Sequence, residues 1–171
     1  MAYSAWGPGP PPNDPRRRDL GSMPLSPDAV RFIAKANEES ERIGHEYVGT
    51  EHLLLAFARR GGAGAGRAEL PVDWDRVRAH TLEIVVPGAT GQRSGVSLPL
   101  TERTKRSLSL AVESARALGH AQAEVPHVLL GVMREGQGVG FHVLHEAGVK
   151  EEDVWHWAER GGDASPPSTG S

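Results

Sequence analysis

The stretch GHEYVGTEHLLL, residues 44–55, decides the fold because a second version of it occurs 75 residues later as GHAQAEVPHVLL, residues 119–130. Both versions keep a Gly-His pair, a second histidine seven residues after the first, and a pair of leucines. The similarity extends without a gap over residues 25–61 and 100–136. An internal repeat of this length indicates two copies of one structural unit.

Each copy has the sequence pattern of helices. Apolar residues recur at helical spacing, and no segment alternates with a period of two as a half-buried strand does. Ser26 and Thr101 precede the first helix of each copy as N-caps, and a glycine follows where a helix end needs a left-handed backbone. We therefore predict an all-α protein with first helices over residues 27–43 and 102–118.

The remaining helices follow from the same spacing. The first copy lacks a third helix, because GGAGAGRAELP, residues 61–71, is too rich in glycine for a stable one. We predict second helices over residues 51–60 and 126–135, a third helix over residues 138–148 of the second copy only, and fourth helices over residues 72–85 and 150–161.

Composition sets the domain boundaries. Residues 1–24 are rich in proline and have no hydrophobic period, and residues 161–171 have the same character, so we predict that both ends are disordered. Between them, we expect repeat 1 at residues 25–86, a linker at 87–98 and repeat 2 at 99–160.

Charge and residue content exclude several classes of function. The chain has 171 residues and a net charge of -3, which argues against a nucleic-acid partner. It has no cysteine, so disulfides and thiolate zinc sites are excluded. No stretch has the roughly 20 apolar residues of a membrane span, and no secretory leader is visible, so we expect a cytoplasmic protein without a membrane partner.

The repeated histidines raise the question of a metal site. His45 and His52 in the first copy match His120 and His127 in the second. The intervening turn breaks the helical phase, and no carboxylate or cysteine set completes a ligand group. We interpret these residues as hydrogen-bonded structural histidines and predict neither a metal nor a cofactor. No nucleophile and base stand at a defined spacing either, so we do not expect an enzyme.

The motif GHEYVGTEHLLLAF and its copy GHAQAEVPHVLLGVMREGQGVGFHVLHEAGV resemble the double Clp N-terminal repeat of ClpC- and ClpA-type unfoldases. The resemblance covers about residues 24–160. It implies two four-helix repeats packed with pseudo-twofold symmetry. The chain has no Gly-x-x-x-x-Gly-Lys-Ser/Thr phosphate loop, so we expect a stand-alone domain without AAA+ modules that does not hydrolyse ATP.

The resemblance also implies a function in Clp-dependent protein quality control. Such domains receive substrate proteins and adaptors, and those of ClpC type resemble receptors for phosphoarginine. The family's contacts carry over to Ser26 and Glu51 in the first copy, whereas in the second copy Thr101 matches but Pro126 replaces the carboxylate. Thr50 either contacts the ligand or only caps its helix. We therefore expect at most one working site, whose partner is a modified or unfolded protein segment, an adaptor or a Clp ATPase.

An alternative function follows from the same resemblance. Family members resemble the targets of cyclic-peptide antibiotics, so a free copy could act as a decoy that protects the cell during stress. An apolar groove between the repeats would carry that binding, with Leu25 and Leu100 at positions where the family commonly has phenylalanine.

Overall fold

The computed structural model describes residues 25–59, 70, 72–89, 95 and 97–160. In these residues every secondary-structure element longer than an isolated β-bridge is a helix, which confirms the all-α prediction. The predicted disorder of both ends and the missing third helix of repeat 1 concern residues outside this description. The helices are α2 (Pro27–Arg42), α3 (Thr50–Arg59), α4 (Trp74–Ile84), α5 (Glu102–Ala117), α6 (Val125–Glu135), α7 (Val139–Glu146) and α8 (Glu151–Glu159).

The predicted caps of the two first helices are confirmed. The side-chain oxygens of Ser26 and Thr101 accept hydrogen bonds from the backbone N–H three residues on, at 3.0 and 3.1 Å. At the other ends, Gly44 and Gly119 have φ angles of 76° and 73°, where a residue with a Cβ would be strained. Local chemistry therefore defines where α2 and α5 begin and end.

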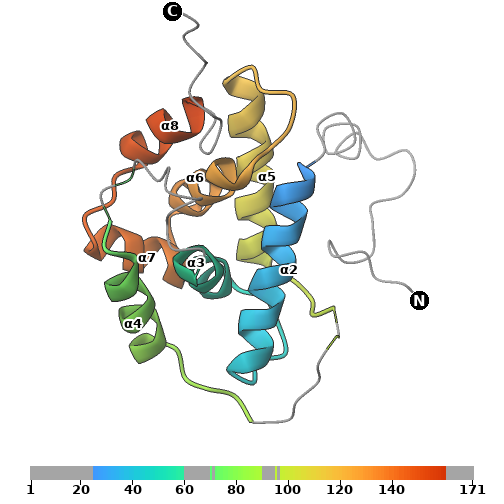
Figure 1. Cartoon of the computed structure of the whole chain (residues 1–171), viewed down its shortest axis with the longest axis vertical. Coiled ribbons are helices and arrows are strands. Elements are labelled where there is room, and N and C mark those ends of the chain that lie inside the picture. The colour runs from blue at the N-terminus through green and yellow to red at the C-terminus, as the bar shows by residue number, and fades with distance from the viewer. Residues whose placement is uncertain (1–24, 60–69, 71, 90–94, 96, 161–171) are drawn as a thin grey trace, which may run out of the picture.

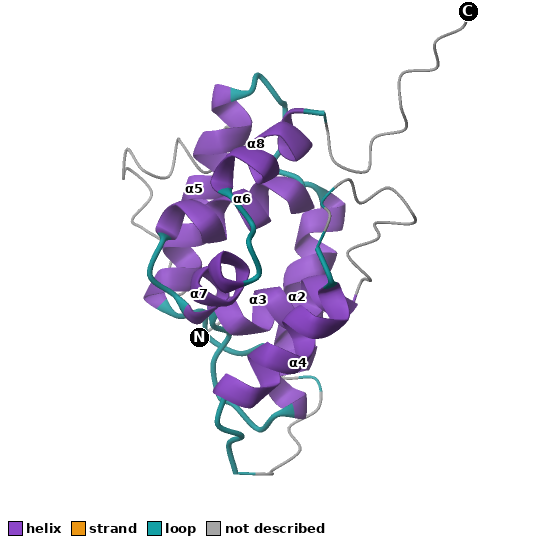
Figure 2. Cartoon of the chain, turned by 90° about the vertical axis from the view of Figure 1, so that its left-hand side faces the viewer, coloured by secondary structure: helices purple, strands orange, loops and turns teal. Residues whose placement is uncertain are grey.

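The second helices, α3 and α6, form the centre of the molecule (Figure 1). Each is covered by the first helix of its own repeat, α2 on α3 and α5 on α6. The fourth helices α4 and α8 pack on α3 and α6 respectively, and lie toward opposite ends of the long axis (Figure 2). Helix α7 contacts both central helices, so repeat 2 supplies a helix that covers repeat 1.

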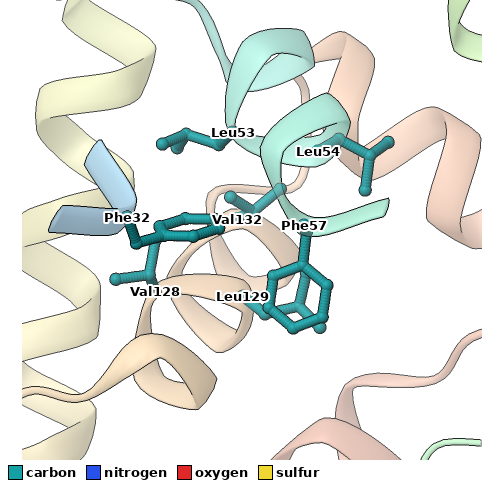
Figure 3. A pocket seen from close by; sticks show the side chains of 7 residues that line it. All are labelled: Phe32, Leu53, Leu54, Phe57, Val128, Leu129 and Val132. Carbon is teal, nitrogen blue, oxygen red and sulfur yellow. The ribbon is translucent and has the colours of Figure 1, made fainter. Parts of the chain in front are cut away.

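An apolar cluster joins the two repeats across this centre (Figure 3). Phe32 of α2 meets Phe57 of α3 edge to face, with ring centroids 5.7 Å apart, and Val128 and Leu129 of α6 lie against them. The side chains in this cluster leave no room for a water molecule among them. The contact between the repeats is therefore core packing at this place.

Two isolated β-bridges connect the repeats in a crossed manner. Leu25, just before α2, pairs with Ala123 in the turn before α6. Leu100, just before α5, pairs with Val48 in the turn before α3. Because Leu25 matches Leu100 and Val48 matches Ala123 in the repeat, the two bridges are related by the pseudo-twofold symmetry that the sequence led us to expect.

Candidate functional site

A chain of hydrogen bonds fixes the histidine pair of repeat 1. The backbone N–H of Gly49 donates to Nδ1 of His52 at 2.8 Å, so this nitrogen is unprotonated. Nε2 of His52 therefore carries the hydrogen and donates to Nδ1 of His45 at 2.9 Å. Nε2 of His45 then donates to the carbonyl oxygen of Val86 at 2.7 Å. The tautomer of each ring thus follows from its hydrogen-bond partners.

Repeat 2 builds the same pair. The N–H of Glu124 donates to Nδ1 of His127 at 2.8 Å, and Nε2 of His127 lies 2.9 Å from Nδ1 of His120. Burial, and then the neighbouring histidine, lower the pKa of His127 to about 4 and that of His52 to about 3. The prediction of hydrogen-bonded structural histidines is confirmed in both repeats.

Glu51 lies beside this pair, so our expectation that no carboxylate joins the histidines in a ligand group is wrong. Ligand-type atoms of His45, Glu51 and His52 lie within 4.8 Å of one another. The lone pair of each ring already accepts a hydrogen bond, so a cation would have to displace those bonds. The same pair exists in repeat 2, where Pro126 leaves no equivalent carboxylate. The histidines are therefore explained by the fold.

The Glu51 side chain folds back over Gly49. Glu51 is only 9% exposed, and a Cβ added at Gly49 would overlap the Glu51 carboxyl group. The equivalent positions of repeat 2 hold Glu124 and Pro126, so the glycine and the carboxylate are lost together. Gly49 thus leaves the space in which the Glu51 carboxyl group lies.

The turn that leads to Glu51 abuts the start of α5, in the other repeat. The N–H of Thr101 donates to the carbonyl oxygen of Val48 at 3.0 Å, and the hydroxyl of Thr104 donates to the same oxygen at 2.9 Å. Thr101 and Glu51 are thus brought to one region through Val48. This region, Thr101 with the first turn of α5 and Glu51, is called the composite site below.

Ser26 is placed differently from our expectation. Its N–H donates to the carbonyl oxygen of Ala123 at 3.0 Å, so it abuts the turn of repeat 2 that leads to Pro126. We had paired Ser26 with Glu51 because both belong to the first copy. The crossed bridges exchange the helix starts between the repeats, so the backbone of Ser26 pairs with repeat 2 rather than with the turn before Glu51.

Thr50 is a residue of α3 itself rather than its cap, and its hydroxyl is used in a contact between the repeats. It is the first residue of the helix and is 2% exposed, and its hydroxyl accepts a hydrogen bond from the N–H of Gly140 in α7 at 3.2 Å. Its equivalent in repeat 2 is Val125, which cannot make this bond. Thr50 therefore ties the two repeats together.

The two leucines assigned to the apolar groove are already packed. Leu100 is 7% exposed, and Leu25 is half-buried against Val112, Ala115 and Ala123. Neither offers a wide apolar surface to a cyclic peptide.

The fold defines a class: a tandem helical-repeat domain in which the start of each repeat pairs with a turn of the other. The family model described as the Clp repeat (R) N-terminal domain matches residues 12–69, 66–147 and 99–160. The chain belongs to the Clp N-terminal repeat family. In the described part of the chain, no helix is both long enough and apolar enough to span a bilayer.

Curated relatives match over most of this chain. One relative is the chloroplastic ATP-dependent Clp protease ATP-binding subunit ClpA homolog of Brassica napus, to which this chain is 37% identical over 129 residues. The aligned region covers 74% of this chain and 14% of that protein. This chain is 35% identical over 123 residues to the negative regulator of genetic competence ClpC/MecB of Bacillus subtilis (strain 168), covering 71% and 15%. The chain thus spans about one seventh of the length of these relatives.

Solved structures share the fold. The N-terminal domain of the chaperone ClpD from Arabidopsis thaliana matches with a TM-score of 0.61 and 22% identity, over 81% of this chain and 96% of that one. The Hsp104 N-terminal domain from Candida albicans matches with a TM-score of 0.59 and 15% identity, over 81% and 93%.

Proposed function

We propose that this chain is a non-enzymatic protein-binding module of Clp-dependent protein quality control. It receives a segment of a substrate protein or an adaptor, and the composite site is the place where it does so. One observation carries the proposal: the crossed bridge between Val48 and Leu100 sets the start of α5 beside the turn that holds Glu51.

The chemistry of this region suits a phosphorylated arginine. The start of a helix presents backbone N–H groups and the positive end of its dipole, which favour a phosphate. A carboxylate such as that of Glu51 forms charge-assisted hydrogen bonds with a guanidinium. The two halves of phosphoarginine thus find complementary groups within one region.

The pseudo-equivalent region at Ser26 has fewer donors at its helix start and no carboxylate in the place of Glu51. Pro27 stands at the first position of α2, where it removes one backbone N–H from the helix start. Pro126 stands in place of Glu51. We therefore propose one working site in the chain, formed with Thr101.

A binding experiment with arginine-phosphorylated protein tests this function. The wild-type chain should bind it and should not bind the same protein after dephosphorylation. Glu51→Ala should weaken binding by about tenfold or more, because a lost charged partner typically costs about 1.5–3 kcal/mol. The matched control is Ser26→Ala, which removes the other helix cap and should leave binding unchanged. Equal binding by wild type and Glu51→Ala would show that the mechanism is wrong.

A further inference from the structure

A groove of about 380 Å³ runs between α2 and α3 on the surface of repeat 1. Its floor is apolar, made by the buried side chains of Phe32 and Ala56. Its sides carry Asp28 and the three cations Arg31, Lys35 and Arg59. An apolar floor with charged sides is typical of sites that bind a protein segment.

The groove exists because the two repeats pack their first helices differently. In repeat 2, Gly131 of α6 lies so close to the backbone of α5 that an added Cβ would overlap the carbonyl oxygen of Ser107. The equivalent residues of repeat 1 are Ala56 and Phe32. Because Ala56 carries the Cβ that Gly131 lacks, α2 and α3 cannot approach so closely.

The cations along the groove are available to a ligand. Arg31 lies 3.5 Å from Asp28, and Lys35 lies 3.2 Å from Glu38, but the side chains of these cations are 71% and 63% exposed. Exposed ion pairs contribute little free energy, so these cations can change partner at small cost.

One end of the groove has a surplus of guanidinium groups. Glu39 is buried, and its Oε1 accepts from Arg59 at 3.0 Å and from Arg42 at 3.3 Å. Arg78 lies 3.6 Å from Oε2, and its buried Nη1 makes no hydrogen bond to any described residue. Among the described residues, three cations thus share one carboxylate, so this end of the groove carries an excess of positive charge.

Repeat 2 has no such surplus at the equivalent place. Ser114 replaces Glu39 and accepts a hydrogen bond from Arg134, the equivalent of Arg59, at 2.8 Å. The equivalents of Arg42 and Arg78 are Ala117 and Asp153. The group of cations around one buried carboxylate is therefore a property of repeat 1, whereas Arg106 and Arg134 keep two of the three groove cations in repeat 2.

We propose that this groove binds an acidic segment of a partner protein. An apolar side chain of that segment lies in the groove, and its carboxylates pair with Arg31, Lys35 and Arg59. Charge complementarity selects this occupant, because the ion pairs among the described residues around the groove join five cations to three carboxylates in a chain whose net charge is -3. The groove is separate from the composite site, which draws on Thr101 and Glu51.

Fluorescence anisotropy with a labelled peptide, acetyl-Asp-Glu-Asp-Leu-Glu-Asp, tests the proposal at low salt. The peptide should bind the wild-type chain, and the same peptide with Asn and Gln in place of every acid should not. The double variant Arg31→Glu/Lys35→Glu should bind about tenfold more weakly or worse, because two attractive pairs become repulsive. Both residues are exposed, so the variant keeps the fold, as circular dichroism will check.

Two control variants make the result decisive. Arg106→Glu reverses the charge at the position of α5 that matches Arg31 and should leave peptide binding unchanged. Glu51→Ala should also leave binding of the acidic peptide unchanged. A loss of phosphoarginine binding at the composite site can therefore be told apart from a loss of peptide binding in the groove. Absence of binding to wild type, equal binding of the uncharged peptide, or an equal loss in Arg106→Glu would overturn the proposal.

Discussion

Repeat 1 and repeat 2 share the parts that build the fold and differ in the parts that a ligand would meet. Both keep the hydrogen-bonded histidine pair and the left-handed glycine after the first helix. They differ at Glu51 against Pro126, and at Ala56 against Gly131. These differences decide where a carboxylate stands and where two helices separate. Duplication has therefore preserved the scaffold while the two surfaces diverged.

We expect the largest loss of stability from a substitution at the close contact between α5 and α6 in repeat 2. Gly131→Ala should lower the free energy of unfolding by about 3 kcal/mol, because the added Cβ overlaps the Ser107 carbonyl and forces α5 and α6 apart. Urea denaturation measures the change. The matched control is Ala56→Gly in repeat 1, which should cost only about 1 kcal/mol in helix propensity. Equal losses in the two variants would show that the repeats pack alike.

The histidine pairs predict a stability that falls in acid. The folded-state pKa values of His52 and His127 are about 3 and about 4, against 6.5 in the unfolded chain. Below pH 6.5 the unfolded chain therefore binds protons at these rings and the folded chain does not. Between pH 7 and pH 5 each ring should lower the free energy of unfolding by about 2 kcal/mol.

Urea denaturation across this range, with NMR titration of the two imidazoles, checks the prediction. A variant with His52→Gln and His127→Gln should show a smaller dependence on pH, because glutamine does not titrate. If either ring gains its proton near pH 6.5 in the folded protein, the shared hydrogen-bond scheme is incorrect.

Repeat 2 should regain a carboxylate site only when two residues change together. Pro126→Glu alone leaves Glu124 at the position that matches Gly49. The Cβ of Glu124 would then lie where the carboxyl group of the new glutamate has to fold back. The double variant Glu124→Gly/Pro126→Glu should add a second phosphoarginine site, raising the stoichiometry measured by calorimetry from one to two. The restored charged partner should contribute about 1.5 kcal/mol. A second site in Pro126→Glu alone would contradict the role of Gly49.

The smallest expected effect concerns the tie between Thr50 and α7. Thr50→Val copies the residue of repeat 2 and removes the acceptor for the N–H of Gly140, so we expect a loss of about 1 kcal/mol in thermal or urea denaturation. Thr50→Ser keeps the hydroxyl and should be nearly neutral by comparison. A neutral Thr50→Val would mean that the bond contributes nothing to the contact between repeats.

The sequence predicted the local part of this structure well. Caps such as Ser26 and Thr101 act within one turn of helix, so their chemistry is readable from neighbouring residues. The predicted helices agree with the observed ones to within two residues at most ends. The histidine pair was also predictable, because it occurs twice with the same spacing.

What sequence reasoning missed depends on contacts between the repeats. The exchange that places Ser26 beside Ala123, and Thr101 beside Val48, joins residues far apart in the chain and leaves no local pattern. The position of Glu51 beside His45 depends on a fold-back over Gly49, which periodicity does not reveal. The groove of repeat 1 did leave a signal, since aligning the repeats sets Ala56 opposite Gly131.

The crossed β-bridges carry a consequence for the origin of this domain. In a single repeat on its own, the residue before the first helix and the turn before the second helix would both lack the backbone partner that the bridges give them. Two identical copies would satisfy each other through the same pair of contacts, which is the self-complementary arrangement of a twofold homodimer. The 171-residue chain therefore has the architecture of such a dimer made covalent, in which fusion freed each half to change without the other.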